Sequence, residues 1–350
     1  MESLDFDQHP NDSWFCIFGG SVQLANNMKK WLGDSATFKF NERTTKISWD
    51  NESKTATVYT ATAPIGTYDA VFNSTTLSTL KLMDLSGVPG LPYATKQAIR
   101  SLAYGPSAKV GMVFSKPWWR HLKENPVLSG GQGHSDLNIR TCVYPSYNLD
   151  EISKDEKEFV LLCSYTWQAD ADRIGAWIGK EGDETALVNL ILKDLARMHA
   201  SATESVDDLL KIITESYTGK CYAHDWARDK NTAGAFAFFR PGQFKNTWPE
   251  LNRANATPGL YIIGEHASTH HAWVVGALES AVAGLYQWLW NNQNMPGVGG
   301  VSGALELLKH HVDGNPFVGR PPYVEESVME WNRHLNMMEQ LLVETLAKAK

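Results

Sequence analysis

The sequence predicts an α/β fold from two features, one near the C-terminal end and one in the middle of the chain. The apolar run 260–263 is typical of a buried parallel strand; it stops at Gly264 and leads through a polar loop to a helix that begins near Trp273. Residues 185–198 repeat apolar side chains every three or four positions, which is typical of an amphipathic helix. Strands and helices therefore share one chain.

The first third of the sequence adds a predicted β-meander. A short apolar segment ends in Gly19-Gly20 and is followed by a helix expected to run to about Leu32. Alternating segments separated by turn compositions come next and predict three antiparallel strands. A returning strand and a helix follow the meander. In chain order these segments are 37–40, 45–49, 56–62, 68–73 and 92–102.

The remaining elements are predicted from alternation and apolar content. Strands are expected over 107–114, 140–144, 158–165 and 212–222, the last leading into Asp225-Trp226. The helix that runs through Trp290 is apolar nearly all round, so it should be buried. Residues 291–303 are rich in Gly and Asn and predict a linker, and a peripheral helix is expected over 324–348.

Composition narrows the class of protein. The chain has 350 residues, an apolar share of 43%, a charged share of 20% and a net charge of −7. These values are typical of a soluble globular protein, and without a cluster of Lys and Arg we expect no nucleic-acid partner. No apolar run reaches the length of a membrane span, and the acidic N-terminus does not resemble a signal peptide, so we expect a cytoplasmic protein.

Cysteine and histidine positions give no metal site. Four cysteines are widely spaced without a Cys-x-x-Cys pair, which excludes a zinc ribbon. Three histidines (His266, His270 and His271) cluster in one loop, but neither cysteine nor carboxylate motifs accompany them. We expect no bound metal.

The segment 259–280 reads Gly-Leu-Tyr-Ile-Ile-Gly-Glu, then His-Ala-Trp-Val-Val-Gly-Ala-Leu-Glu-Ser after a short loop. It resembles the segment with which flavin-dependent amine oxidases, and L-amino-acid oxidases in particular, contact FAD. The resemblance begins at Gly19-Gly20 and runs to about Trp290. It implies a flavin amine oxidase-like fold, with an FAD-binding part and a mixed-sheet substrate domain.

The Gly-x-Gly-x-x-Gly turn expected of a flavoprotein is not found in this chain. The segments Gly130–Gly133 and Gly297–Gly303 have the wrong spacing, and neither follows an apolar strand. The chain therefore resembles the C-terminal half of the family fold, truncated at the N-terminus. The resemblance implies four parts: a first FAD-binding part over 12–104, a substrate-binding domain over 105–226, a second FAD-binding part over 227–291, and a linker with a helical tail over 292–350.

The resemblance assigns roles in catalysis and substrate binding. Lys109 matches the lysine that holds a water against flavin N5, although a lysine in an alternating strand could equally face solvent. Tyr144 matches a tyrosine whose hydroxyl binds the substrate carboxylate. Phe236 would line the substrate side, and Trp273 would form one wall of an aromatic cage around the substrate amine.

The resemblance also assigns cofactor contacts. Trp226 would lie against the flavin ring, and Glu265, after Gly264, would anchor the ribityl–pyrophosphate region of FAD. Trp273 and the amide of Val274 would face the flavin at a helix N-terminus, where the dipole favours negative charge. Thr44 lies near the place where the family meets the adenine.

These roles imply FAD-dependent oxidative deamination of an L-amino acid or a related primary amine by oxygen. The products would be an imine or keto acid, ammonia and hydrogen peroxide. Because the pyrophosphate-binding turn is missing, we expect weak FAD binding by this chain alone and a need for a complementing chain or a homodimer. The alternatives are a non-flavin scaffold that acts as a binding module, and a non-redox enzyme that uses Lys109 or Glu265 as an acid–base group.

Overall fold

The computed structural model describes residues 17, 19–146, 158–179, 184–254 and 259–292. Contacts divide the chain into two compact units, residues 1–284 and 285–350. All elements below belong to the first unit except the last turns of helix α9. The predicted linker over 291–303 and helix over 324–348 lie almost wholly outside the described residues. The four-part division of the sequence stays a prediction.

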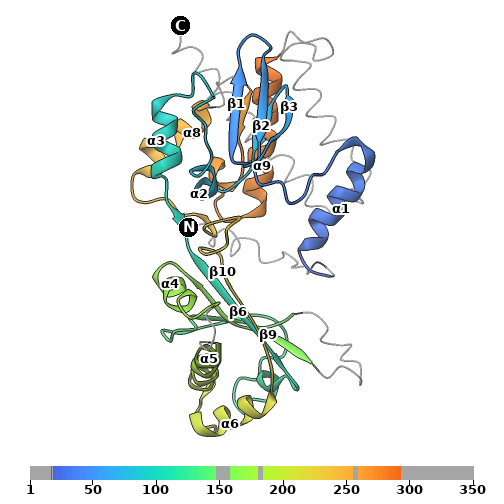
Figure 1. Ribbon diagram of the computed structural model, residues 1–350. Coiled ribbons are helices and arrows are strands. Elements are labelled where there is room, and N and C mark those ends of the chain that lie inside the picture. The colour runs from blue at the N-terminus through green and yellow to red at the C-terminus, as the bar shows by residue number, and fades with distance from the viewer. Residues whose placement is uncertain (1–16, 18, 147–157, 180–183, 255–258, 293–350) are drawn as a thin grey trace, which may run out of the picture. The chain divides into compact units, whose positions relative to one another are not determined.

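A five-stranded antiparallel sheet forms one core of the first unit. Its strands lie in the order β10, β6, β9, β8, β7, with bounds Tyr217–Asp225, Ser107–Phe114, Phe159–Trp167, Thr141–Val143 and Gln132–His134. Helices α4 (Ala169–Gly175), α5 (Glu184–His199) and α6 (Val206–Ser216) accompany this sheet in Figure 1. The predicted strand over 107–114 and the helix predicted over 185–198 are confirmed.

Alternation along β6 separates the two faces of this sheet. Val110, Met112 and Phe114 are fully buried with residues of α4, α5 and α6, whereas Lys109 is only half-buried on the other face. Trp118 and Trp119 follow in a short 3₁₀ turn and pack edge-on against Phe114. The lysine thus lies opposite the apolar core.

The predicted meander is present, and two of its three strands lie close to their predicted positions. Its antiparallel strands are β1 (Lys46–Asp50), β2 (Thr55–Tyr59) and β3 (Pro64–Tyr68). The expectation of a strand over 37–40 is wrong. The return after β2 is made by a tight turn in which the Thr60 amide donates to the Ala63 carbonyl at 2.9 Å, so Pro64–Tyr68 becomes the third strand.

A second core surrounds a two-stranded parallel sheet. Strand β4 (Val71–Asn73) pairs with β12 (Leu260–Ile262), as predicted for the apolar run near residue 260. Strand β5 (Tyr104–Gly105) pairs antiparallel with β11 (Phe236–Ala237). The helices of this region are α1 (Val22–Leu32), α2 (Leu77–Leu80), α3 (Tyr93–Ser101), α7 (Gln243–Asn246), α8 (Pro249–Ala254) and α9 (Val274–Asn291). The helices predicted before Leu32, over 92–102 and from Trp273 are confirmed.

The prediction of a strand from residue 212 is wrong in its first half. Residues 206–216 form α6, because the Ser205 side chain caps the helix by accepting from the Asp208 amide at 3.2 Å. The negative charges of Asp207 and Asp208 in the first turn also stabilise the positive end of the helix dipole. Leu209 and Ile213 fall on one helical face and are buried. Strand β10 begins only at Tyr217.

The expected burial of α9 is also wrong for its first turns. Val274, Val275 and Leu278 keep 61%, 42% and 43% of their surface exposed. An apolar helix face is buried only where another element covers it, and this face is open to solvent in the structure. Within the described ranges, none of the helices combines the length and apolarity needed to cross a bilayer.

Candidate functional site

Glu265 lies at a junction of three segments. It begins a 3₁₀ turn that two residues separate from the end of β12, and its Oε1 accepts from the Tyr104 hydroxyl at 2.5 Å and from the Ala237 amide at 3.0 Å. Its Oε2 accepts from the Ala272 amide at 2.9 Å. One half-buried carboxylate therefore joins β5, β11 and the loop that leads into α9.

Gly264 gives this junction its backbone geometry. Its φ of 119° is poorly accessible to residues with a Cβ, and an added Cβ would lie 2.6 Å from Cε1 of His266. The Gly264 amide donates to the Ser280 hydroxyl at 2.7 Å, which fixes the end of β12 to α9. In this structure the amide of Gly264 is thus engaged by the protein.

The histidine loop is held by protein contacts. Nδ1 of His270 lies 2.8 Å from Oε2 of Glu279, and an added Cβ at Gly276 would meet the His270 carbonyl at 2.0 Å. His266 is almost fully buried, and burial, with a smaller effect of His271, lowers its pKa to about 4. Its imidazole is therefore neutral near pH 7. The described residues contain no group of three potential metal ligands.

Lys109 faces two side chains that the sequence analysis did not single out. Its Cα partners are Tyr165 on β9 and His224 on β10, and its Nζ lies 4.7 Å from the centre of the Tyr165 ring. This distance is typical of a cation–π contact. Burial raises the pKa of Tyr165, so its ring stays neutral beside the ammonium.

Trp226 lies directly after β10 and is held near the start of β6. Its amide donates to the Ser107 carbonyl at 3.0 Å, and its carbonyl accepts from the Gly234 amide at 2.9 Å. Its ring lies edge-on to His224, with 4.4 Å between ring centres. Phe236 begins β11, two residues after Gly234. The structure thus brings Trp226, Phe236 and the Lys109 strand together.

Trp273 and Val274 stand at the start of α9. The tryptophan side chain is 42% exposed, and Val274 is the first residue of the helix. The first amides of a helix lack intrahelical partners and lie at the positive end of its dipole. Because the Ala272 amide binds Glu265, this helix end is linked to the junction.

Tyr144 lies in the apolar core beneath the five-stranded sheet. Nδ1 of His199 lies 2.7 Å from the Leu195 carbonyl and must donate to it, so Nε2 accepts from the Tyr144 hydroxyl at 2.5 Å. Burial raises the pKa of Tyr144 and lowers that of His199, which keeps both groups neutral. The hydroxyl predicted to bind a substrate carboxylate is engaged by a histidine here.

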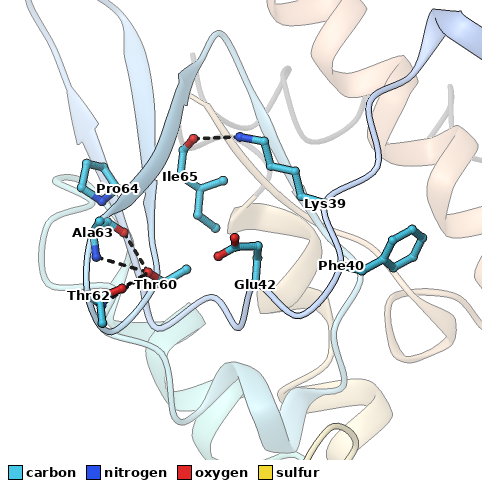
Figure 2. Close-up of a pocket in the computed structure, with 8 residues that line it drawn as sticks. All are labelled: Lys39, Phe40, Glu42, Thr60, Thr62, Ala63, Pro64 and Ile65. Atoms are coloured by element: carbon cyan, nitrogen blue, oxygen red, sulfur yellow. Dashed lines mark hydrogen bonds between the residues drawn. The ribbon is translucent and has the colours of Figure 1, made fainter.

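Thr44 lies in the segment that leads into β1. Its neighbour Arg43 donates to the Lys230 carbonyl at 2.8 Å. A cavity of about 490 Å³ is lined by residues that are close to Thr44 in the sequence, and none of the predicted site residues lines it. Figure 2 shows its lining, which comes from the segment before β1, the β2–β3 turn and the start of β3: Lys39, Phe40, Glu42, Thr60, Thr62, Ala63, Pro64 and Ile65.

Tyr104, Tyr165 and His224 are three polar residues near the predicted site residues that the sequence analysis missed. Alternation along their strands indicates which side chains share a face, but not which strands pair. Tyr104 is 161 residues from Glu265, so only folding reveals their contact.

Comparison with known proteins identifies the family. The family model described as flavin containing amine oxidoreductase matches residues 2–283, and the chain belongs to this family. It is 36% identical over 288 residues to L-amino-acid oxidase 4 of Hebeloma cylindrosporum. This match covers 79% of the present chain and 44% of the oxidase. It is 27% identical over 285 residues to an L-amino-acid oxidase of Neurospora crassa, covering 79% of this chain and 38% of that protein.

Solved structures share the fold. The match to cyclohexylamine oxidase from Brevibacterium oxydans covers 76% of this chain and 52% of the oxidase chain, with a TM-score of 0.55 and 13% identity. The match to putrescine oxidase bound to putrescine covers 84% of this chain and 52% of the oxidase chain, with a TM-score of 0.50 and 18% identity. The flavin amine oxidase-like fold is therefore confirmed. The chain spans about half the length of these structures and less than half of the two oxidases above.

Proposed function

We propose that this chain carries part of the active site of an FAD-dependent oxidase that deaminates an L-amino acid or a related primary amine. The observation that supports the proposal best is the junction at Glu265. It joins the strand pair β5–β11, which leads into the Lys109 strand, to the N-terminus of α9. Two relatives are named as L-amino-acid oxidases, which favours an amino acid as substrate.

The residues at the junction are compatible with a flavin. A carboxylate has about four acceptor positions, and donors from the described part of the chain use three of those on Glu265, so one remains there for a ligand hydroxyl. The exposed Trp273 and the N-terminus of α9 offer a flat surface and amide donors. Glu265, Trp226, Trp273 and Val274 would hold the cofactor, with Gly264 shaping the loop and Thr44 nearest the adenine.

When bound, the flavin would accept a hydride from the substrate and pass the electrons to oxygen. The ammonium of Lys109 would hold a water and stabilise negative charge that develops nearby. Tyr165 would keep that ammonium in place through the contact at 4.7 Å. The rings of Phe236 and Trp273 would orient the substrate amine. Tyr144 would bind a carboxylate only after its hydroxyl turned away from His199.

We propose further that FAD binds weakly to this chain alone and that a complementing polypeptide, or a second copy, completes the site. The test is the visible absorbance of the purified chain with FAD. It is measured with and without a polypeptide that supplies the part of L-amino-acid oxidase 4 outside the match. Oxidised flavin absorbs at about 370 and about 450 nm. We expect retained bands, and hydrogen peroxide release with L-amino acids, only when the polypeptide is present.

Lys109→Met should keep the flavin bands and lower the turnover of that assembly by about a hundredfold, the effect of losing one charge-stabilising donor. Lys116→Met, an exposed position after the same strand, is the matched control. Protein that stays colourless with the polypeptide present would overturn the proposal. It would favour the alternative, a binding module without flavin, in which the three donors to Glu265 only join the strands to α9.

A further inference from the structure

Tyr104 makes the shortest contact at the Glu265 junction. Its hydroxyl lies 2.5 Å from Oε1 of Glu265, and 161 residues separate the two in the sequence. Hydrogen bonds to a carboxylate are shorter and stronger than neutral ones. The hydroxyl therefore fixes one oxygen of Glu265 and, with it, the direction of the other.

The Tyr104 ring is itself held in place. An added Cβ at Gly234 would lie 2.7 Å from Cδ1 of Tyr104, so the ring packs directly on this glycine, whose φ is 150°. In the β5–β11 pair, Tyr104 lies opposite Ala237, and the Ala237 amide donates to the same Oε1 at 3.0 Å. Two donors from paired strands thus converge on one oxygen.

The phenol keeps the proton that it donates to Glu265. Burial and the neighbouring Glu265 carboxylate raise the pKa of Tyr104, so the hydroxyl keeps its proton at neutral pH. With Oε1 occupied twice, Oε2 is directed to the Ala272 amide at 2.9 Å. Among the residues that the structure describes, none uses the second acceptor position on Oε2, next to the start of α9.

We propose that Tyr104 is a positioning residue that sets the direction of the Glu265 carboxylate, so that Oε2 holds the turn at Ala272 and offers one acceptor position to a ligand hydroxyl. The inference rests on the proposed function for the identity of that ligand, FAD. The positioning itself concerns only this chain and can be tested without cofactor.

The test compares Tyr104→Phe with Tyr93→Phe, an exposed tyrosine at the start of α3. Amide hydrogen exchange is followed at Ala272, with the Gly264 amide, which is bonded to Ser280, as internal reference. We expect exchange at Ala272 to become about tenfold faster in Tyr104→Phe, because a hydrogen bond to a charged group is lost from the network, and Gly264 to change little. Tyr93→Phe should behave like the parent protein.

Cofactor binding gives a second readout. In the assembly with the complementing polypeptide, Tyr104→Phe should weaken FAD binding by about tenfold in a flavin fluorescence titration. Unchanged exchange at Ala272, or equal acceleration at Ala272 and Gly264, would overturn the inference, because either shows that Tyr104 does not orient Glu265. If the parent assembly binds no FAD, the proposed function fails while the exchange experiment still decides the role of Tyr104.

Discussion

His266 follows the junction glutamate and is buried with a lowered pKa. The pKa of His266 is about 4 in the folded protein and 6.5 in the unfolded chain. Above pH 6.5 the imidazole is neutral in both states, so its burial then carries no cost from protonation and stability is fully present. As the pH falls from 6.5 towards 4, the unfolded chain takes up a proton that the folded chain refuses. At about 1.4 kcal/mol per pH unit, the free energy of unfolding should fall by about 3 kcal/mol over this window.

His266→Gln should remove this part of the pH dependence. The measurement is urea denaturation of parent and variant between pH 4 and pH 7, with the exposed His121→Gln as control. Only the difference between parent and variant is informative, since carboxylates titrate over the same range. Parallel curves for the parent and His266→Gln would contradict the assigned pKa.

Gly264 offers a second test at single-residue resolution. Gly264→Ala should lower the free energy of unfolding by about 2–3 kcal/mol, because the added methyl meets the His266 ring and the backbone is strained at a φ of 119°. Gly131→Ala separates the two causes, because Gly131 also has a positive φ, 96°, but open space around its Cβ position. Thermal unfolding of both variants would show a larger loss for Gly264→Ala; equal losses would mean that the contact with His266 is unimportant.

Single residues also show what a sequence can predict about a site. Gly264 and Glu265 were predicted from a strand that ends in a polar loop, and the structure places them at the end of β12. Lys109 was predicted from the family resemblance. Tyr165, which lies under its ammonium, was not, because a cation–π contact across two strands depends on their register.

Among the elements, α6 shows how a cap overrides strand propensity. Residues 212–222 are rich in β-branched and aromatic side chains, yet their first five residues are helical, because Ser205 and the acidic first turn start a helix earlier in the chain. A prediction made from residues 212–222 alone does not include Ser205 and the acidic turn, which start the helix. Helix and strand preferences are weak compared with capping and burial of Leu209 and Ile213.

Ser205→Ala should therefore destabilise the protein by about 1 kcal/mol, through loss of the bond to the Asp208 amide. Urea denaturation measures the change, Ser205→Thr should restore most of the loss, and Ser35→Ala is an exposed control. A Ser205→Ala protein as stable as the parent would mean that the helix does not depend on this cap.

At the scale of the whole molecule, the open face of α9 is the feature that the relatives help to interpret. The chain spans 44% of L-amino-acid oxidase 4, and Val274, Val275 and Leu278 stay exposed at the start of the helix. Exposed apolar surface of this kind commonly marks an interaction site. The exposed face supports the proposal, made above, that a complementing polypeptide completes the site.

Replacing Val275 and Leu278 together by Gln should lower the fluorescence of a neutral apolar dye bound to the isolated chain, because both apolar side chains are exposed side by side at the start of the helix. Leu82→Gln, an exposed leucine elsewhere, should change it little. Circular dichroism would verify that the helix content of each variant is retained. Equal dye binding by all variants would show that α9 is covered in solution.

The sequence by itself determined most of the longer strands and helices, the parallel strand that precedes Gly264 and the family to which the chain belongs. These features depend on local periodicity and short motifs, which are visible in a single chain. The tertiary structure alone decided that Tyr104 meets Glu265, that His199 engages the Tyr144 hydroxyl and that α9 is open on one side. Such contacts join residues far apart in the sequence, and they depend on strand register and packing, which local patterns do not specify.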